Sequence, residues 1–324
     1  MRPAETPPDV FAAVMATGIL SIAAGKHHYP QISATLGVLA SLGLLVLVVL
    51  VLATGAFKRW DLNDPDVTLR LFTFVAACAV LDSRLASQRV IALVLGAVAL
   101  LAWLALIVLT AGDMSRRSWA ALRDGAHGAW ELASVGASGL AIVATAAARH
   151  SNWWLWVAVP VWVVALCTYG LMTWLILWRT VSERQDLDGF EPDTWILMGG
   201  LAIATLAGDH IHGLVPGWLA ATVRVVTVVT WVLATLWIPP LIYFGLHRIS
   251  QRPDMLHFAG VWWALVFPLG MYSAATYAMS VEIGQRSLVT VSLVFFWDAL
   301  AAWLIVVVAG VLRAVAQLVM ADRD

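Results

Sequence analysis

Four Pro-Asp pairs, each standing directly before an apolar run, divide this chain into repeated units. They are Pro8-Asp9, Pro65-Asp66, Pro192-Asp193 and Pro253-Asp254, at intervals of 57, 127 and 61 residues. The middle interval is close to two periods of roughly 60 residues, and a fixed period of this kind indicates an internal repeat. Aspartate is a favoured N-cap residue and a preceding proline opposes helix in the incoming chain, so each pair predicts a helix start. A fifth start without the proline is expected near 124–130, which gives five units.

The composition indicates an integral membrane protein. Hydrophobic residues form 61% and charged residues 12% of the 324 residues, whereas soluble domains carry about 25% charged residues. The net charge is −1, which gives no reason to expect a nucleic-acid partner. We therefore expect this chain to lie in a lipid bilayer.

Ten apolar segments can be recognised, and they alternate between two kinds. They cover approximately residues 10–25, 32–56, 68–82, 90–110, 128–148, 153–178, 194–208, 223–244, 255–280 and 288–312. The even-numbered segments are rich in leucine and valine, which suits contact with lipid, whereas the odd-numbered segments are rich in small residues. Small residues let helix backbones approach closely in a membrane. Each unit is therefore predicted to be a hairpin of one inner and one outer helix.

The expected fold is an all-α membrane protein with ten transmembrane helices, arranged as five hairpins with pseudo-fivefold symmetry around a central pore. The hairpins occupy about 9–56, 66–110, 128–178, 193–244 and 254–312 of a single transmembrane domain, 1–324. Some odd-numbered segments fall short of the about 20 residues that a span needs, but short helices can cross where other helices bury them. Thirteen Lys and Arg residues lie on the side of the N-terminus and six on the other. Both termini are therefore expected in the cytoplasm, with the chain in the plasma (inner) membrane.

The inner segments resemble a known family of transport proteins. The phrases are VMATGILSIAAG at 14–25, MGGLAIATLAG at 198–208 and WWALVFPLGMYSAATYAM at 262–279. They are similar to those of the tellurite-resistance/dicarboxylate transporter family, which includes yeast malate permeases and the slow-type anion channels of plant guard cells. The resemblance implies five helical hairpins around a central pore, commonly in a homotrimer. It also implies that a phenylalanine on the ninth helix, here Phe267, plugs the pore.

Phe267 and Pro268 are the candidate gate. Proline removes an intrahelical hydrogen bond and can kink a helix, and a large ring at a kink can obstruct a narrow path. Hydrophobic constrictions close pores by excluding water. The alternative is a phenylalanine that simply packs between helices, as most aromatic residues at helical spacing do.

Small and hydroxyl-bearing residues on the inner segments are the candidates for the pore lining. The candidates are Thr17, Gly18, Ser21, Phe74, Ser134, Ser138, Gly199, Thr205, Gly270 and Thr276. Hydroxyl groups that face a pore can donate weakly to a passing anion. Such groups can equally satisfy backbone carbonyls or pack between helices, and the pattern leaves both interpretations open.

Polar residues follow the far end of each inner segment, where fivefold packing would gather them at one outer mouth. The candidates are Lys26, His28, Arg84, Arg149, His210 and Arg286. Because histidine titrates near neutral pH, we hypothesise that acidification outside makes this mouth more positive and increases anion entry. The alternative is a set of solvated loops. The tract Asp209/His210/His212 lacks a clear four-ligand spacing for zinc, so no metal is predicted.

Two carboxylates lie within the apolar segments. Glu131 opens the fifth segment, where the helix dipole favours a negative charge. Asp298 lies in the tenth segment, and a hydrogen bond to a neighbouring helix is expected for it. Neither is predicted to bind the substrate.

The predicted function is transport of anions through a central pore: small inorganic anions, tellurite-type oxyanions or C4-dicarboxylates. No arginine cluster lies within a segment, so a high-affinity clamp for dicarboxylates is not visible. A proton-coupled dicarboxylate carrier is the main alternative. An intramembrane enzyme or a metal-responsive sensor is less favoured, because the chain has no HExxH-type motif. We therefore expect no enzymatic activity and no cofactor.

Overall fold

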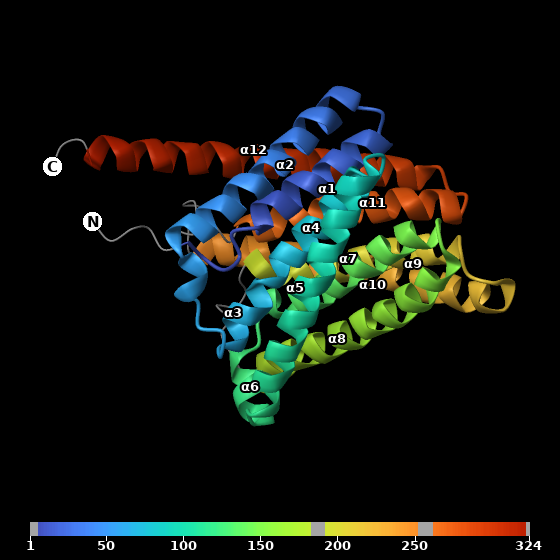
Figure 1. Cartoon of the computed structure of the whole chain (residues 1–324), viewed down its shortest axis with the longest axis horizontal. Helices are drawn as coiled ribbons and strands as arrows, with labels where there is room; N and C mark the ends of the chain where they lie inside the picture. The colour runs from blue at the N-terminus through green and yellow to red at the C-terminus, as the bar shows by residue number, and fades with distance from the viewer. Residues whose placement is uncertain (1–5, 183–191, 252–261, 322–324) are drawn as a thin grey trace.

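The structure is a computed structural model that describes residues 6–182, 192–251 and 262–321, and these residues form helices without any β-strand (Figure 1). The helices are α1 (Ala12–Lys26), α2 (Pro30–Thr54), η1 (Ala56–Lys58), α3 (Pro65–Arg70), α4 (Phe72–Arg84), α5 (Arg89–Ser115), α6 (Trp119–Gly125), η2 (Gly128–Glu131), α7 (Leu132–Ala148), η3 (Asn152–Trp154), α8 (Leu155–Ser182), η5 (Pro192–Trp195), α9 (Ile196–His212), α10 (Gly217–Gln251), α11 (Trp263–Glu282) and α12 (Ser287–Ala321). The predicted all-helical class is therefore confirmed.

Eight helical stretches within the described residues are long and apolar enough to cross a membrane. They are Pro30–Thr54, Arg89–Ser115, Gly128–Ala148, Asn152–Ser182, Pro192–His212, Gly217–His247, Trp263–Glu282 and Ser287–Arg313. Helices α1 and α4 have only 15 and 13 residues, fewer than the about 20 that a straight span needs. The chain is thus an integral membrane protein, and the prediction of ten spans is supported by length for eight of them.

Two kinds of helix differ sharply in burial, as the alternation of segments predicts. The most apolar windows of Gly128–Ala148, Pro192–His212 and Trp263–Glu282 are 78–83% buried. The corresponding windows of α2, α5, α8, α10 and α12 are only 17–28% buried. Because apolar residues exposed on a membrane protein face lipid at no cost, this contrast separates inner from outer helices.

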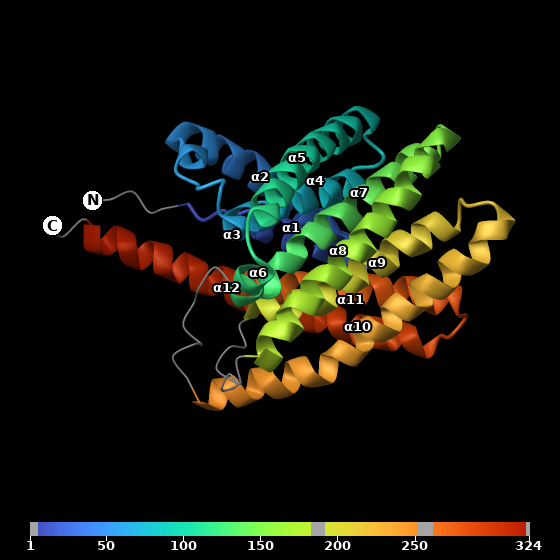
Figure 2. The same ribbon diagram turned by 90° about the horizontal axis from the view of Figure 1, so that it is seen from below.

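The inner helices contact one another in a closed cycle. Helix α1 packs on α4, α4 on α7, α7 on α9, α9 on α11, and α11 returns to α1. Each inner helix also packs on the next long helix in the chain, which gives the pairs α1–α2, α4–α5, α7–α8, α9–α10 and α11–α12. Figures 1 and 2 show the inner helices within the bundle and the outer ones around them.

Small residues make the close contacts between the inner helices possible. A Cβ atom added at Gly18 of α1 would lie 2.7 Å from Val80 Cγ1 of α4. One added at Gly199 of α9 would lie 3.0 Å from Pro268 Cγ of α11. These glycines therefore serve backbone approach between neighbouring helices.

Two of the Pro-Asp pairs, Pro65-Asp66 and Pro192-Asp193, begin short helices, but their aspartates are not the N-caps that the sequence predicts. Asp64 caps α3, because its carboxylate accepts a hydrogen bond from the backbone N–H of Asp66. Asp193 lies inside η5, and the N-cap position of α1 is taken by Phe11 without a side-chain cap. Asp254 lies outside the described residues. The short helices α3 and η5 precede α4 and α9, which leaves Asp66 and Asp193 available for other partners.

Candidate functional site

A cavity of about 150 Å³ lies among the middle and C-terminal parts of the five inner helices. It is lined by Ile19, Ile22 and Lys26 of α1, Ala79, Val80 and Ser83 of α4, Gly139 and Ile142 of α7, Ile203, Leu206 and His210 of α9, and Met271 of α11. Because every member of the helix cycle contributes to its wall, the cavity lies at the centre of that cycle. We call it the central cavity.

The wall of the central cavity is apolar apart from a few polar groups toward the C-terminal ends of the helices. Lys26 is the cation among the lining residues, and its Nζ lies 5.5 Å from the centroid of the Tyr277 ring. His210 donates a hydrogen bond from Nδ1 to the carbonyl oxygen of Leu206 at 2.7 Å. A cation beside a small apolar space favours a negatively charged occupant.

Toward the N-terminal ends of the inner helices, the central cavity ends at a layer of packed apolar side chains. Met15, Val135 and Phe267 each lie four positions before a lining residue, so each shares that residue's helix face. Their exposed fractions are 1%, 0% and 0%. Phe267 lies one helical turn before Met271, about 6 Å along the axis. The cavity is thus followed, toward the N-terminal ends of the inner helices, by a tightly packed apolar layer.

The predicted pore-lining hydroxyl groups turn toward outer helices. Thr17 accepts a hydrogen bond from Trp303 Nε1 of α12 at 2.9 Å, and Thr276 accepts one from Trp231 Nε1 of α10 at 3.1 Å. Thr205 shares a hydrogen bond with a hydroxyl of α10, the Oγ1 of Thr230, at 2.9 Å. These three hydroxyl groups have partners between packed helices, as most buried hydroxyl groups do.

The other pore-lining candidates also lie away from the central cavity wall. Ser21 donates a hydrogen bond to the carbonyl oxygen of Ser33. Phe74 packs edge-on against Phe11. The glycine candidates lie at contacts between helices; they are Gly18, Gly199 and Gly270. Ser134 and Ser138 are buried, and their hydroxyl oxygens have no hydrogen-bond partner. None of the ten candidates is among the residues that line the cavity.

The structure brings together two of the six outer-mouth candidates. Lys26 and His210 line the central cavity. Arg84 instead donates from Nε to Ser21 Oγ at 2.7 Å, within the contact of α1 with α4. His28, Arg149 and Arg286 are exposed in the connections between helices.

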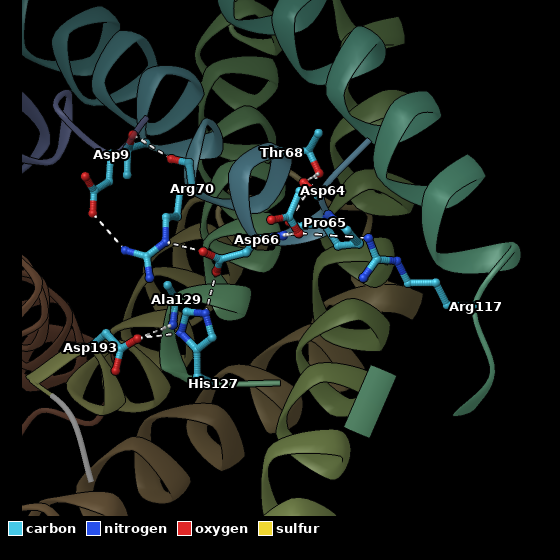
Figure 3. A network of polar contacts seen from close by, with 11 residues as sticks. Asp9, Asp64, Pro65, Asp66, Thr68, Arg70, Arg117, His127, Ala129 and Asp193 are labelled. Atoms are coloured by element: carbon cyan, nitrogen blue, oxygen red, sulfur yellow. Dashed lines mark hydrogen bonds and ion pairs between the residues drawn. The ribbon is translucent and has the colours of Figure 1, made fainter. Parts of the chain in front are cut away.

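A network of polar contacts at the opposite ends of the inner helices was not predicted (Figure 3). Arg70 binds Asp9 through Nη1 at 3.1 Å and Asp66 through Nε at 3.0 Å. His127 hydrogen-bonds Asp66 through Nε2 and Asp193 Oδ2 through Nδ1, the latter at 2.6 Å. Asp9 precedes α1, Asp66 and Arg70 precede α4, His127 precedes α7, and Asp193 precedes α9. The network therefore joins the N-terminal ends of four inner helices. The repeated aspartates were its signal in the sequence.

His127 carries a positive charge in this network at neutral pH. Burial by itself lowers the pKa of an imidazole, but the hydrogen bonds and charges of Asp193 and Asp66 outweigh it and raise the pKa of His127 to about 9. Burial works against ionisation of Asp66 as well, yet His127 and Arg70 together lower the pKa of that carboxyl group. Two cations therefore face three carboxylates, which neutralises most of the charge at this end of the bundle.

Glu131 lies at the N-terminus of α7, as predicted, whereas Asp298 differs from expectation. Glu131 is completely buried, with Oε1 accepting from Thr173 Oγ1 at 2.7 Å and Oε2 without a hydrogen-bond partner. Asp298 is exposed on α12 rather than packed against a neighbouring helix. No group of three or more potential metal ligands lies together in the described part of the chain.

Comparisons with known proteins agree with an integral membrane protein. Residues 5–311 match the model of a family described as voltage-dependent anion channel. The chain is also 32% identical over 122 residues to an uncharacterized membrane protein of Mycobacterium tuberculosis strain CDC 1551 / Oshkosh, and equally to one of strain ATCC 25618 / H37Rv. Each match covers 36% of this chain and 62% of the relative, so the chain spans less than two thirds of the length of these curated relatives.

Proposed function

Because this chain belongs to the voltage-dependent anion channel family, we propose that it transports anions across a membrane through a path between its five inner helices. The central cavity carries this proposal, since all five inner helices contribute to its wall. Lys26 supplies a cation to that wall, which favours anions over cations.

The path lies on the axis of five helical hairpins related by pseudo-fivefold symmetry, in a single transmembrane domain. The closed cycle of contacts among α1, α4, α7, α9 and α11 supports this arrangement, as does the packing of each on an outer helix. The short helices α1 and α4 cross with the others because their neighbours bury them. A homotrimer in the plasma (inner) membrane with cytoplasmic termini is the assembly that we propose.

Phe267 is the residue that we propose closes the path. Support comes from its complete burial, from its position one turn before the cavity residue Met271, and from the adjacent Pro268 within α11. An apolar layer in a narrow path excludes water and therefore ions. Removal of the ring would open a route between the cavity and the N-terminal ends of the helices.

The size and chemistry of the central cavity favour small anions that bind weakly. Pockets for drug-sized ligands occupy about 300–1,000 Å³, whereas this cavity has about 150 Å³. No arginine lines it, so bidentate recognition of a carboxylate is not provided there. Small inorganic anions fit this description better than tellurite-type oxyanions or C4-dicarboxylates held in a tight site.

The test is anion flux into liposomes that contain purified protein. The Phe267→Ala variant should raise flux on the order of tenfold while selectivity for anions is retained, because the apolar constriction widens. Phe296→Ala is a matched control, since Phe296 is also fully buried but lies on the outer helix α12. A Phe267→Ala protein that is folded, as judged by its helix content and elution volume, and yet no more conductive than Phe296→Ala would refute the gate.

A proton-coupled carrier for dicarboxylates is the second candidate, and Glu131 is the observation that favours it. A fully buried carboxyl group with one unpartnered oxygen is a candidate site for proton binding within a membrane. Uptake of malate driven by a pH gradient, and lost in Glu131→Gln, would support this candidate. Passive flux of chloride that is unchanged in Glu131→Gln would support the channel instead.

A further inference from the structure

A crevice of about 350 Å³ lies between the outer helices α5 and α8, apart from the central cavity. It is closed at one end by α6 and backed by the inner helices α4 and α7, which contribute Phe72 and Ala133. Figure 1 shows α5 and α8 converging on α6 at this end of the molecule. Most of the wall is apolar, with side chains such as Ile107 and Leu171. We call this space the lateral crevice.

One polar group inside the lateral crevice lacks a partner. Thr110 is 5% exposed, and its Oγ1 has no hydrogen bond. By contrast, Thr205 and Thr227 donate to the carbonyl oxygen four residues earlier in their helices. A buried hydroxyl without a partner is unfavourable, so an acceptor atom on an occupant of the crevice would satisfy Thr110.

The mouth of the lateral crevice carries residues typical of the membrane–water interface. Arg117 and Trp119 line it, and 43% of the Arg117 side chain and 56% of Trp119 are exposed. Arg117 Nη2 donates a hydrogen bond to the carbonyl oxygen of Asn63 at 3.2 Å and lies 4.0 Å from Asp64 Oδ1. The other guanidinium N–H groups can therefore donate to a further acceptor. Arginine and tryptophan concentrate at the level of the lipid headgroups.

The polar groups of the crevice follow the order of groups in a phospholipid. Thr110 lies five residues before Ser115, the last residue of α5, which is about 7.5 Å deeper along the helix axis. Arg117 follows two residues after that helix end. A phospholipid has its phosphate at the surface, its ester groups below and its acyl chains deepest. Arg117 therefore lies at the level of the phosphate, Thr110 near the esters, and the apolar wall below.

We propose that the lateral crevice binds one anionic phospholipid, with its phosphate on Arg117 and an acyl chain between α5 and α8. A free phosphate ion would leave the apolar part of the crevice unfilled. The faces of α5 and α8 beside the crevice carry exposed apolar side chains, such as Val108 and Trp174, so lipid is the medium that surrounds its opening. This site is independent of the function proposed for the central cavity.

The test is native mass spectrometry of the protein titrated with phosphatidylglycerol and, separately, with phosphatidylcholine. The wild-type chain should bind one phosphatidylglycerol about fivefold more tightly than phosphatidylcholine, since one arginine near the headgroups adds about that preference. Arg117→Gln should abolish the preference. Ala111→Trp should abolish the tight site altogether, because Ala111 lines the crevice and the indole would fill it.

Two controls and two contrary outcomes complete the experiment. Val108→Trp adds the same ring to an exposed face of α5, and Arg89→Gln removes a charge from the other end of α5; both should bind lipid as the wild type does. Equal affinity for the two lipids, unaffected by Ala111→Trp in folded protein, would refute the proposal in favour of unspecific contact with the bilayer. A change of oligomeric mass in Ala111→Trp, without a change in lipid binding, would assign the crevice to a second copy of the chain.

Discussion

Replacement of His127 by glutamine tests whether the network at the N-terminal helix ends holds the bundle together. The pKa of His127 is raised from 6.5 to about 9 in the folded chain. A difference of about 2.5 between the two pKa values corresponds to about 3 kcal/mol of folding free energy, at about 1.4 kcal/mol for each pKa unit. The side chain is 21% exposed, so solvent screens this contribution only in part.

The sign of the pH dependence follows from the direction of the pKa change. Because the folded pKa of His127 lies above its unfolded value, the stabilisation is complete below about pH 6.5 and disappears as the pH rises through about 9. Asp66 behaves in the opposite sense, since its lowered pKa contributes stability above pH 3.8 that is lost as the pH falls. The network should therefore be strongest in mildly acidic to neutral solution.

The assay is thermal unfolding in detergent, followed by tryptophan fluorescence from pH 6 to pH 10. The ring of Trp130 lies 6.4 Å from that of His127, and Trp130 is one of the 18 tryptophans that contribute to the signal. Wild-type Tm should fall across this range, whereas His127→Gln should start several degrees lower at pH 7 and fall less. His150→Gln is the control, since His150 is exposed. Parallel decreases of Tm in wild type and His127→Gln would refute the reasoning.

Two further predictions concern the central cavity and its helices. Lys26→Gln should reduce the preference for anions over cations in liposome flux, whereas Lys58→Gln, which changes an exposed lysine, should not. Gly18→Leu should destabilise the chain by about 1–3 kcal/mol, seen as a lower Tm, because its Cβ alone would lie 2.7 Å from Val80 Cγ1.

The division into inner and outer helices could be predicted because it depends on local composition. The run at 44–52 consists of leucine and valine, whereas the run at 133–148 consists mostly of small residues. This difference in composition assigns each run to the outer or the inner class without any knowledge of the helices beside it. The boundaries could be predicted less well: α12 continues to Ala321, beyond the expected end at 312. Helix ends depend on capping and on neighbouring segments, which an apolar run does not encode.

The rotation of each inner helix could not be predicted. In water, a polar stripe on a helix marks the face that points away from the core, but in a bilayer both sides of an inner helix are packed against other helices. Thr17 and Thr276 therefore looked equally suited to a pore or to an outer helix, and the structure places both against tryptophans of outer helices. The cavity wall is formed instead by residues such as Ile203 and Met271.

The location of this chain in a membrane, the burial of its inner helices and the repeated aspartates at one end of the bundle all follow from hydrophobicity and from the repeat period. Both are properties of the amino-acid sequence that can be recognised without knowledge of the fold. Helix packing is what brings His127 to Asp66 and Asp193, and what joins five separate helix faces at one small cavity. These contacts join residues more than 60 positions apart, and they exist only because packing fixes the rotation and depth of every helix at once.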